Sequence, residues 1–466
     1  MSGMVSTDRN EAARLLARLD RLPPTRSIWR LVTLLSLGGM FEFYDLFMTG
    51  YVIPGLVKAG LLSGVAVGIF TGPALFVAAT FAGLFIGTFV FGFVADRYGR
   101  RAIFTYSLLF YCAATLIMAF QNSGFTVCLW RLIAGIGIGV ELVTIDTYIA
   151  ELVPKGVRGR AFAYNQLIQF AVVPIVAFLA YELVPLTPLG YDGWRFVVAL
   201  GAVGALFIWF IRRAVPESPR WLIQQGRLQE AQAITETIEA DVVRDLGGKQ
   251  LPAPAEHAVD AGERGRFAEI WVAPYRSRTL MLCVFQFFQT FGFYGFAAWV
   301  PTLIAQQTGI KLGESLLYSF VIAIANPFGP MIAMTFADRF ERKWQLVGAA
   351  IGVGVFGVLF SLQTTVGMLV LFGVLITLCN NVLSNTFHGY QTELFPTRVR
   401  ARAVGFTYSF SRVSTIFASF IIGYFLNAAG TKGVFGLIAF AMLMVVLSIG
   451  IFGPRTNDLE LEQISR

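Results

Sequence analysis

Histidine and cysteine are scarce in this sequence, with two and four residues among 466. The two histidines lie far apart, and the cysteines lack the paired spacing of a metal site or a disulfide framework. There is also no nucleophile–base constellation and no phosphate-binding loop. We therefore expect no metal, no other cofactor and no enzymatic activity. The residues concerned are His257, His388, Cys112, Cys128, Cys283 and Cys379.

Charged residues are also few, at 14% of the chain, whereas 56% of the residues are hydrophobic. This balance excludes an ordinary soluble domain and indicates a polytopic membrane protein. The net charge of +8 resides in short loops between apolar segments. There it sets the topology in the membrane, so we expect no binding of nucleic acid.

Twelve apolar runs are each long enough to cross about 30 Å of hydrocarbon at about 1.5 Å per residue. They predict an all-α polytopic membrane protein with twelve transmembrane helices in two pseudo-symmetric six-helix bundles. The runs are 29–57, 67–95, 102–121, 125–152, 160–185, 193–213, 278–306, 314–337, 344–363, 366–393, 402–427 and 432–453.

One long polar segment divides these runs into six and six. We predict a segment 1–28 whose amphipathic stretch Glu11–Leu22 lies at the membrane interface, a bundle over 29–213, a linker over 214–277, a bundle over 278–453 and a tail over 454–466. The linker is expected to hold two surface helices, Leu222–Ile238 and Phe267–Trp271.

Arginine and lysine concentrate in the loops after the second, fourth, sixth, eighth and tenth runs. The opposite loops offer only Lys58, Lys311 and Lys432. Both termini and the linker are therefore predicted to be cytoplasmic. We expect a multi-pass monomer in the cell inner (cytoplasmic) membrane.

Two motifs occur once in each half of the chain. GFVADRYGRR (Gly92–Arg101) matches TFADRFERK (Thr335–Lys343), and AELVPKGVRGRA (Ala150–Ala161) matches TELFPTRVRARA (Thr392–Ala403). Two matches at equivalent helices indicate an internal duplication. Repeated halves around a site at the bilayer midplane are the architecture of alternating access.

These motifs resemble the major facilitator superfamily. The first loop matches its signature at Gly92, Asp96, Arg97, Gly99, Arg100 and Arg101, and the fourth run matches at Arg131, Gly135 and Gly139. Tyr148, Glu151, Pro154, Arg158 and Gly159, with PESPRWL (Pro216–Leu222), resemble the branch of sugar porters and organic-ion transporters. The resemblance implies two six-helix bundles that rock about a central cavity.

The resemblance within that branch favours organic acids over sugars. The PETKG ending of the sugar porters is absent, because the chain reads GPRTNDLELEQI after the last run. The stretch Thr392–Val413 resembles carriers of organic acids and nicotinate. A sugar substrate is thereby placed in doubt.

Asp45 lies near the middle of the first run and is the predicted proton site. A carboxylate that alternates between a desolvated environment and a nearby cation can carry a proton. Arg131, in the fourth run, is the expected partner, and the alternative is a permanent buried ion pair. Glu42, one helical turn before Asp45, is a second candidate for the proton site or a substrate contact. Glu141 and Asp146 in the fourth run are assigned to gating or to a structural bond.

Arg412 lies in the eleventh run and has no acidic residue on its own helix. A guanidinium binds a carboxylate through two parallel hydrogen bonds, so we predict that Arg412 binds an anionic substrate. The alternatives are an ion pair with Glu393 or a packing role. Neutral polar side chains are predicted to complete the cavity: Tyr44, Gln166, Gln286, Gln289, Tyr294, Asn326, Asn381 and Asn385.

Charged residues in the cytoplasmic loops are predicted to form salt bridges that close an inner gate. These residues are Asp96, Arg97, Arg101, Glu151 and Arg158 in the first half, and Asp338, Arg339, Glu393 and Arg400 in the second.

The sequence thus predicts a proton-coupled symporter that imports a small organic anion, a monocarboxylate that is aromatic in one version of the hypothesis. Its partners are the small-molecule substrate, protons and the lipid bilayer. A proton-coupled sugar or polyol symporter is the first alternative, and a nutrient receptor that does not transport is the second.

Overall fold

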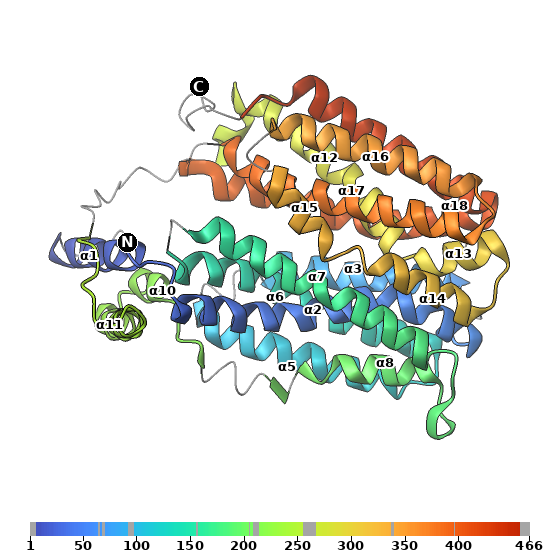
Figure 1. Cartoon of the computed structure of the whole chain (residues 1–466), viewed down its shortest axis with the longest axis horizontal. Coiled ribbons are helices and arrows are strands. Elements are labelled where there is room, and N and C mark those ends of the chain that lie inside the picture. The colour runs from blue at the N-terminus through green and yellow to red at the C-terminus, as the bar shows by residue number, and fades with distance from the viewer. Residues whose placement is uncertain are drawn as a thin grey trace.

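The computed structural model describes residues 6–63, 66–67, 70–91, 97–154, 157–204, 206–207, 214–254, 267–336, 340–395 and 397–456. Within these ranges the chain is almost entirely helical. The exception is a small hairpin in which β1 (Ala66–Val67) pairs antiparallel with β2 (Phe70–Thr71). The helices of the two halves form two bundles that lie side by side, blue to green and yellow to red in Figure 1.

The first bundle contains α2 (Arg26–Lys58), α3 (Gly72–Phe91), α5 (Arg100–Ala119), α6 (Gly124–Leu152), α7 (Arg158–Leu183), the 3₁₀ turn Pro188–Gly190 and α8 (Gly193–Gly201). The second contains α12 (Tyr275–Ala297), α13 (Val300–Thr308), α14 (Leu312–Ala323), α15 (Phe328–Phe336), α16 (Arg342–Leu362), α17 (Val366–Glu393) and α18 (Thr397–Phe452). Each of the twelve predicted runs coincides with a described helix over at least part of its length. The twelve-helix fold predicted from the sequence is confirmed.

These helices differ from the predicted runs at three places. The seventh run divides between α12 and α13 just before Pro301, and the eighth divides between α14 and α15 beside Pro327. Proline supplies no backbone N–H and disfavours helical geometry in the residue before it. The eleventh and twelfth runs are joined in α18 through Gly430, whose φ of 64° is a left-handed conformation that glycine adopts at little cost. Of the residues that the structure describes, ten helices are long and apolar enough to span a membrane.

Glycine allows α3 and α6 to pack with their backbones almost in contact. A Cβ atom added at Gly87 would lie 2.1 Å from the carbonyl oxygen of Ile136, and one added at Gly139 would lie 2.3 Å from that of Leu84. Helices in a bilayer associate through such close contacts between small residues. The glycines of α3 and α6 therefore let the two backbones approach closely.

A layer of short helices lies beyond one end of the bundles, on the left in Figure 1. It consists of α1 (Ser6–Asp20), α10 (Pro219–Gln224), α11 (Leu228–Asp245) and the 3₁₀ helix η3 (Phe267–Trp271). Loop charges predict this side to be cytoplasmic, and we refer to it as the inner end and to the opposite side as the outer end.

The prediction of an interfacial helix near the N-terminus is wrong. The apolar face of α1 is buried on α10 instead, where Ala12 and Leu15 form a small core with Trp221 and Leu222. Burying these side chains against protein removes the apolar face that a membrane interface would otherwise have covered.

Charged contacts fasten the same helix. Arg18 Nη2 lies 2.6 Å from Glu239 Oε2, and Arg21 Nη2 lies 2.7 Å from Glu239 Oε1. The single linker helix expected over 222–238 is also corrected to two helices, which separate at Gly226 with a φ of 76°.

Candidate functional site

Asp45 and Arg131 form the predicted ion pair at the centre of the first bundle. Arg131 Nη1 lies 2.8 Å from Asp45 Oδ2, and the side chains are 0% and 1% exposed for arginine and aspartate. The guanidinium also donates to Thr80 Oγ1 at 2.9 Å, Thr49 Oγ1 at 2.7 Å and the backbone oxygen of Asp45 at 2.7 Å. Thr115 donates to Asp45 Oδ1 at 3.1 Å. A buried pair so fully hydrogen-bonded satisfies both charges without water.

The ion pair lies directly behind the wall of a small cavity. Thr49, which accepts from Arg131, lines this cavity together with Phe81 and Tyr294. Asp45 is therefore separated from the space between the bundles by one layer of side chains.

Arg412 on α18 is buried with only 2% of its surface exposed. Its Nη2 atom donates to the hydroxyl of Tyr408 at 3.1 Å, and its guanidinium carbon lies 4.9 Å from the centroid of that ring. The Nε and Nη1 atoms have no hydrogen-bond partner in the described part of the chain. The guanidinium edge that carries Nε and Nη2 is the one on which a carboxylate accepts two parallel bonds, so an anion there would take Nε together with the Nη2 atom that now bonds to Tyr408.

Carboxylates of the other bundle approach Arg412 without bonding to it. Glu42 on α2 and Asp146 on α6 both lie within electrostatic range of its charge. Glu393, the partner considered for Arg412 from the sequence, instead pairs with Arg342. The charge of Arg412 therefore faces the interface between the bundles.

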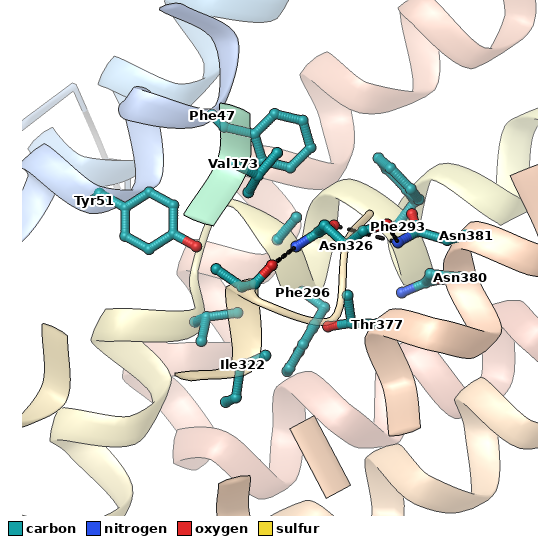
Figure 2. A pocket seen from close by; sticks show the side chains of 13 residues that line it. Phe47, Tyr51, Val173, Phe293, Phe296, Ile322, Asn326, Thr377, Asn380 and Asn381 are labelled. Atoms are coloured by element: carbon teal, nitrogen blue, oxygen red, sulfur yellow. Dashed lines mark hydrogen bonds between the residues drawn. The ribbon is translucent and has the colours of Figure 1, made fainter. Parts of the chain in front are cut away.

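A larger cavity lies beside this interface (Figure 2). Asn326 and Asn381, both predicted, line it, and Asn381 Nδ2 donates to the backbone oxygen of Asn326 at 3.2 Å. Asn380 also lines the cavity and donates to Gly292 O at 3.1 Å. Sequence reasoning missed Asn380, although it precedes Asn381 and is itself buried in an apolar run.

The opposite wall of this cavity comes from the first bundle. Phe47, Tyr51 and Val173 face the asparagines across the space in Figure 2. The cavity thus combines amide groups from one bundle with aromatic and aliphatic surface from the other, a lining typical of small-molecule sites.

The remaining residues predicted to line the cavity differ in burial and in location. Gln286 is fully buried on α12 with its Nε2 atom unpartnered among the described residues, and Gln289 donates to its Oε1 at 3.4 Å. Gln166 and Asn385 are half-buried. Tyr44 is a correction, because its hydroxyl donates to Val197 O at 2.8 Å inside the first bundle, away from both cavities.

The bundles are packed together toward the outer end. A Cβ atom added at Gly50 of α2 would lie 2.6 Å from the backbone oxygen of Ala298, and the rings of Phe178 and Phe320 lie 5.5 Å apart. Asp146, in the inner third of α6, is by contrast exposed although it faces the charge of Arg412. The bundles are therefore in closer contact at the outer end than around Asp146.

An aromatic cluster crosses the interface between the two cavities. Phe81 of α3 packs on Tyr294 of α12 with ring centroids 4.7 Å apart, and Phe170 of α7 lies 6.4 Å from Phe293. Phe293 and Tyr294 also pack edge to face at 4.9 Å. This cluster continues the contact between the bundles inward from the outer end.

Two ion pairs near the inner end repeat the internal duplication. Arg100, the first residue of α5, pairs with Glu151 near the end of α6 at 3.0 Å. Arg342, the first residue of α16, pairs with Glu393, the last residue of α17. Each pair joins two helices of the same bundle.

Two tyrosines reproduce the same symmetry. Tyr148 donates to Pro216 O at 2.5 Å, and Tyr390, three residues before Glu393, donates to Pro454 O at 2.8 Å. Each bond connects the segment that follows the last helix of a bundle to a helix of that bundle, α6 in the first and α17 in the second.

The other predicted gate residues have different surroundings. The partner of Glu151 is Arg100, one position before the predicted Arg101, whose backbone N–H donates to Glu217 Oε1 at 3.2 Å. Arg158 lies 3.9 Å from Asp20. The exposed Arg97 covers the ring of Tyr98 at 5.5 Å. Asp96, Asp338 and Arg339 lie outside the described residues, as does the side chain of Arg400 at the start of α18.

Similar proteins are known. A sequence model described as "Sugar (and other) transporter" matches residues 31–466. YyaJ of Bacillus subtilis (strain 168), whose name describes it only as a metabolite transport protein, is 31% identical over 446 residues, which are 95% of this chain and 96% of YyaJ. The niacin transporter NiaP of Acinetobacter baylyi is 27% identical over 97% of this chain and 99% of its own. The inward-open structure of the xylose transporter XylE from E. coli superimposes with a TM-score of 0.71 at 21% identity, over 94% of this chain and 99% of XylE.

Proposed function

The chain belongs to the sugar (and other) transporter family of the major facilitator superfamily, and we propose that it is a proton-coupled symporter that imports a small organic monocarboxylate. It is a multi-pass membrane transporter and not an enzyme. The monocarboxylate substrate, the proton as coupling ion and the monomeric state are what we propose beyond the family. The alternative of a receptor that does not transport is set aside, because the family consists of transporters.

The buried guanidinium of Arg412 is the observation that carries the proposal. A buried charge without partners is costly, and two of its donors are unpartnered among the described residues. A substrate carboxylate that accepts from Nε and Nη2, in place of the Tyr408 hydroxyl, would neutralise the charge and lower that cost. The nearby Tyr294, Phe293 and Phe47 offer flat apolar surface that suits an aromatic ring. The names of two relatives, the niacin transporters, support this substrate class.

Proton coupling is assigned to Asp45 and Arg131. In the present arrangement the carboxylate oxygens accept from the Arg131 guanidinium and from the Thr115 hydroxyl. Protonation of Asp45 would release Arg131 and loosen α2 from α6, which gives the proton control over movement of these helices. One proton carried with one monoanion is electroneutral, so transport of this kind draws on the pH gradient alone.

A sugar or polyol symporter is the second candidate. The amide groups of Asn326, Asn380 and Asn381 favour it, because neutral hydrogen-bonding groups recognise hydroxyls. The solved structures of the xylose transporter share the fold but, at 21% identity, do not extend that substrate to this chain.

Competition for binding separates the two candidates. Purified protein in detergent is incubated with labelled nicotinate, and benzoate, nicotinamide, xylose and glucose are added as competitors. We expect benzoate to displace the label and the neutral sugars to leave it in place. Displacement by a sugar, or thermal stabilisation by sugars alone, would assign the cavity to the second candidate.

A further inference from the structure

Two carboxyl groups near the ion pair form no salt bridge with any residue that the structure describes. Glu42 is 0% exposed, and neither of its carboxyl oxygens has a hydrogen-bond partner in the described part of the chain. Glu141 is also 0% exposed, and its Oε1 atom is likewise unpartnered there. Arg131, the guanidinium nearest in the bundle, is fully engaged by Asp45 and two threonines.

Glycine brings the two carboxyl groups together. Glu141 Oε1 lies 3.6 Å from the position that a Cβ atom would take at Gly38, one helical turn before Glu42 on α2. At the next residue, Gly39, the amide nitrogen of Gln169 occupies the space of the missing side chain. Glu42 and Glu141 are thus close enough to repel one another if both are ionised.

The hydrogen bond that Glu141 does make is weak. Ser107 Oγ donates to Glu141 Oε2 at 3.4 Å but lies only 2.8 Å from the carbonyl oxygen of Ile103. The single hydroxyl hydrogen of Ser107 therefore does little to stabilise a negative charge on Glu141. An ionised carboxylate in such a site costs so much that the group becomes neutral instead.

We propose that Glu42 and Glu141 form a second proton-binding site, distinct from Asp45 and Arg131, which binds a proton cooperatively with an anion at Arg412. This inference rests on the proposed anion symport. Arg412 faces Glu42 across the interface, and its free charge favours loss of the proton from Glu42. An anion on Arg412 neutralises that charge, so Glu42 keeps its proton while the substrate is bound. By linkage, the proton then tightens binding of the anion to the same extent.

The surroundings of Glu42 allow this exchange. When the anion leaves, the O–H bond of Glu42 breaks and the proton passes to water that reaches the exposed Asp146. The other titratable or charged groups that face the site come from every neighbouring element: Tyr111 from α5, Glu141 and Asp146 from α6, Arg412 and Tyr408 from α18, and Asp45 from α2 itself.

A second proton makes transport electrogenic, and this consequence is measurable. Two protons with one monoanion carry a net positive charge inward, so nicotinate added to reconstituted liposomes should produce a current. Glu42→Gln and Glu141→Gln mimic the protonated side chains and should abolish the current while uptake driven by a pH gradient persists. Nicotinate affinity in the wild type should fall about tenfold per pH unit in the alkaline range, as one linked proton requires, and should become independent of pH in Glu42→Gln.

Two controls make the outcome decisive. Glu182→Gln removes an exposed carboxylate of α7 and should behave as the wild type. Asp45→Asn should keep the pH dependence of binding. Wild-type currents in Glu42→Gln and Glu141→Gln, or nicotinate uptake without current in the wild type, would overturn the second site.

An infrared measurement at acidic pH, where Glu42 binds its proton even without an anion on Arg412, tests the site without any substrate. The band of protonated carboxyl groups in the purified wild-type protein should weaken in Glu42→Gln and in Glu141→Gln but not in Glu182→Gln. A band unchanged by both substitutions refutes the site. Absence of nicotinate binding with the band still assigned to Glu42 and Glu141 instead refutes the proposed substrate and leaves the proton site intact.

Discussion

Arg412→Ala gives the sharpest test of the substrate class. A hydrogen bond to a charged group contributes about 1.5–3 kcal/mol, so two bonds from Nε and Nη2 contribute at least about 3 kcal/mol. At about 1.4 kcal/mol per tenfold change, the dissociation constant of nicotinate should rise about 100-fold or more. Arg412→Lys keeps the charge but loses the fork of two donors, and should recover only part of this loss.

Nicotinamide provides the matched ligand for this experiment. It has the same ring with a neutral amide in place of the carboxylate, so its weaker binding should change by less than about fivefold in Arg412→Ala. Isothermal titration of the purified variants measures both constants.

Tyr408→Phe is the matched protein control. It removes the hydroxyl that accepts from Arg412 at 3.1 Å but keeps the ring beneath the guanidinium, so binding of nicotinate should weaken only slightly. Equal losses for nicotinate and nicotinamide in Arg412→Ala would show that the side chain supports the structure and does not bind the carboxylate.

Three further predictions follow from other parts of the molecule. Asp45→Asn should abolish accumulation driven by a pH gradient, keep counterflow exchange and lower stability by about 3–5 kcal/mol, measured by transport in liposomes and thermal unfolding; unaltered accumulation would remove this residue from the mechanism. Gly87→Ala should lower the unfolding temperature because the added Cβ meets the carbonyl of Ile136 at 2.1 Å, whereas Gly436→Ala, with open space around it, should not. Burial raises the pKa of the Glu239 carboxyl, but hydrogen bonds from its two arginine partners outweigh this and leave the pKa below its ordinary value of 4.5. Docking of α1 should therefore be strongest above that pH and weaken as the pH falls through the lowered pKa, with Glu239→Gln loosening α1 already at neutral pH in hydrogen exchange.

The sequence was most informative where a charged residue lies in an apolar run. Asp45 and Arg131 need partners in hydrocarbon, and each is the other's partner in the structure. Arg412 stood out for the same reason. The fold followed from the run lengths and the duplicated loops, which depend on local sequence alone.

The direction in which each side chain points, and contacts between residues far apart in the sequence, were harder to predict. A helix turns about 100° per residue, and the length of a run does not fix its rotation, so the sequence did not show that the Tyr44 hydroxyl bonds to Val197 inside the first bundle. Asn380 lines the larger cavity for the same geometric reason. The docking of α1 depends on Trp221, about two hundred residues later in the chain, and no local pattern encodes that contact.

The two matched ion pairs at the inner end have a mechanical consequence. The pairs are Arg100–Glu151 and Arg342–Glu393, and each joins two helices of the same bundle. We therefore expect each bundle to move as a rigid body. The conformational change of the transport cycle is then expected at the interface between the two bundles and not within either bundle. Substitutions that alter the transport rate without changing the melting temperature should therefore lie at the interface between the bundles, on α2, α7, α12, α14 and α18. They should seldom lie on helices away from this interface.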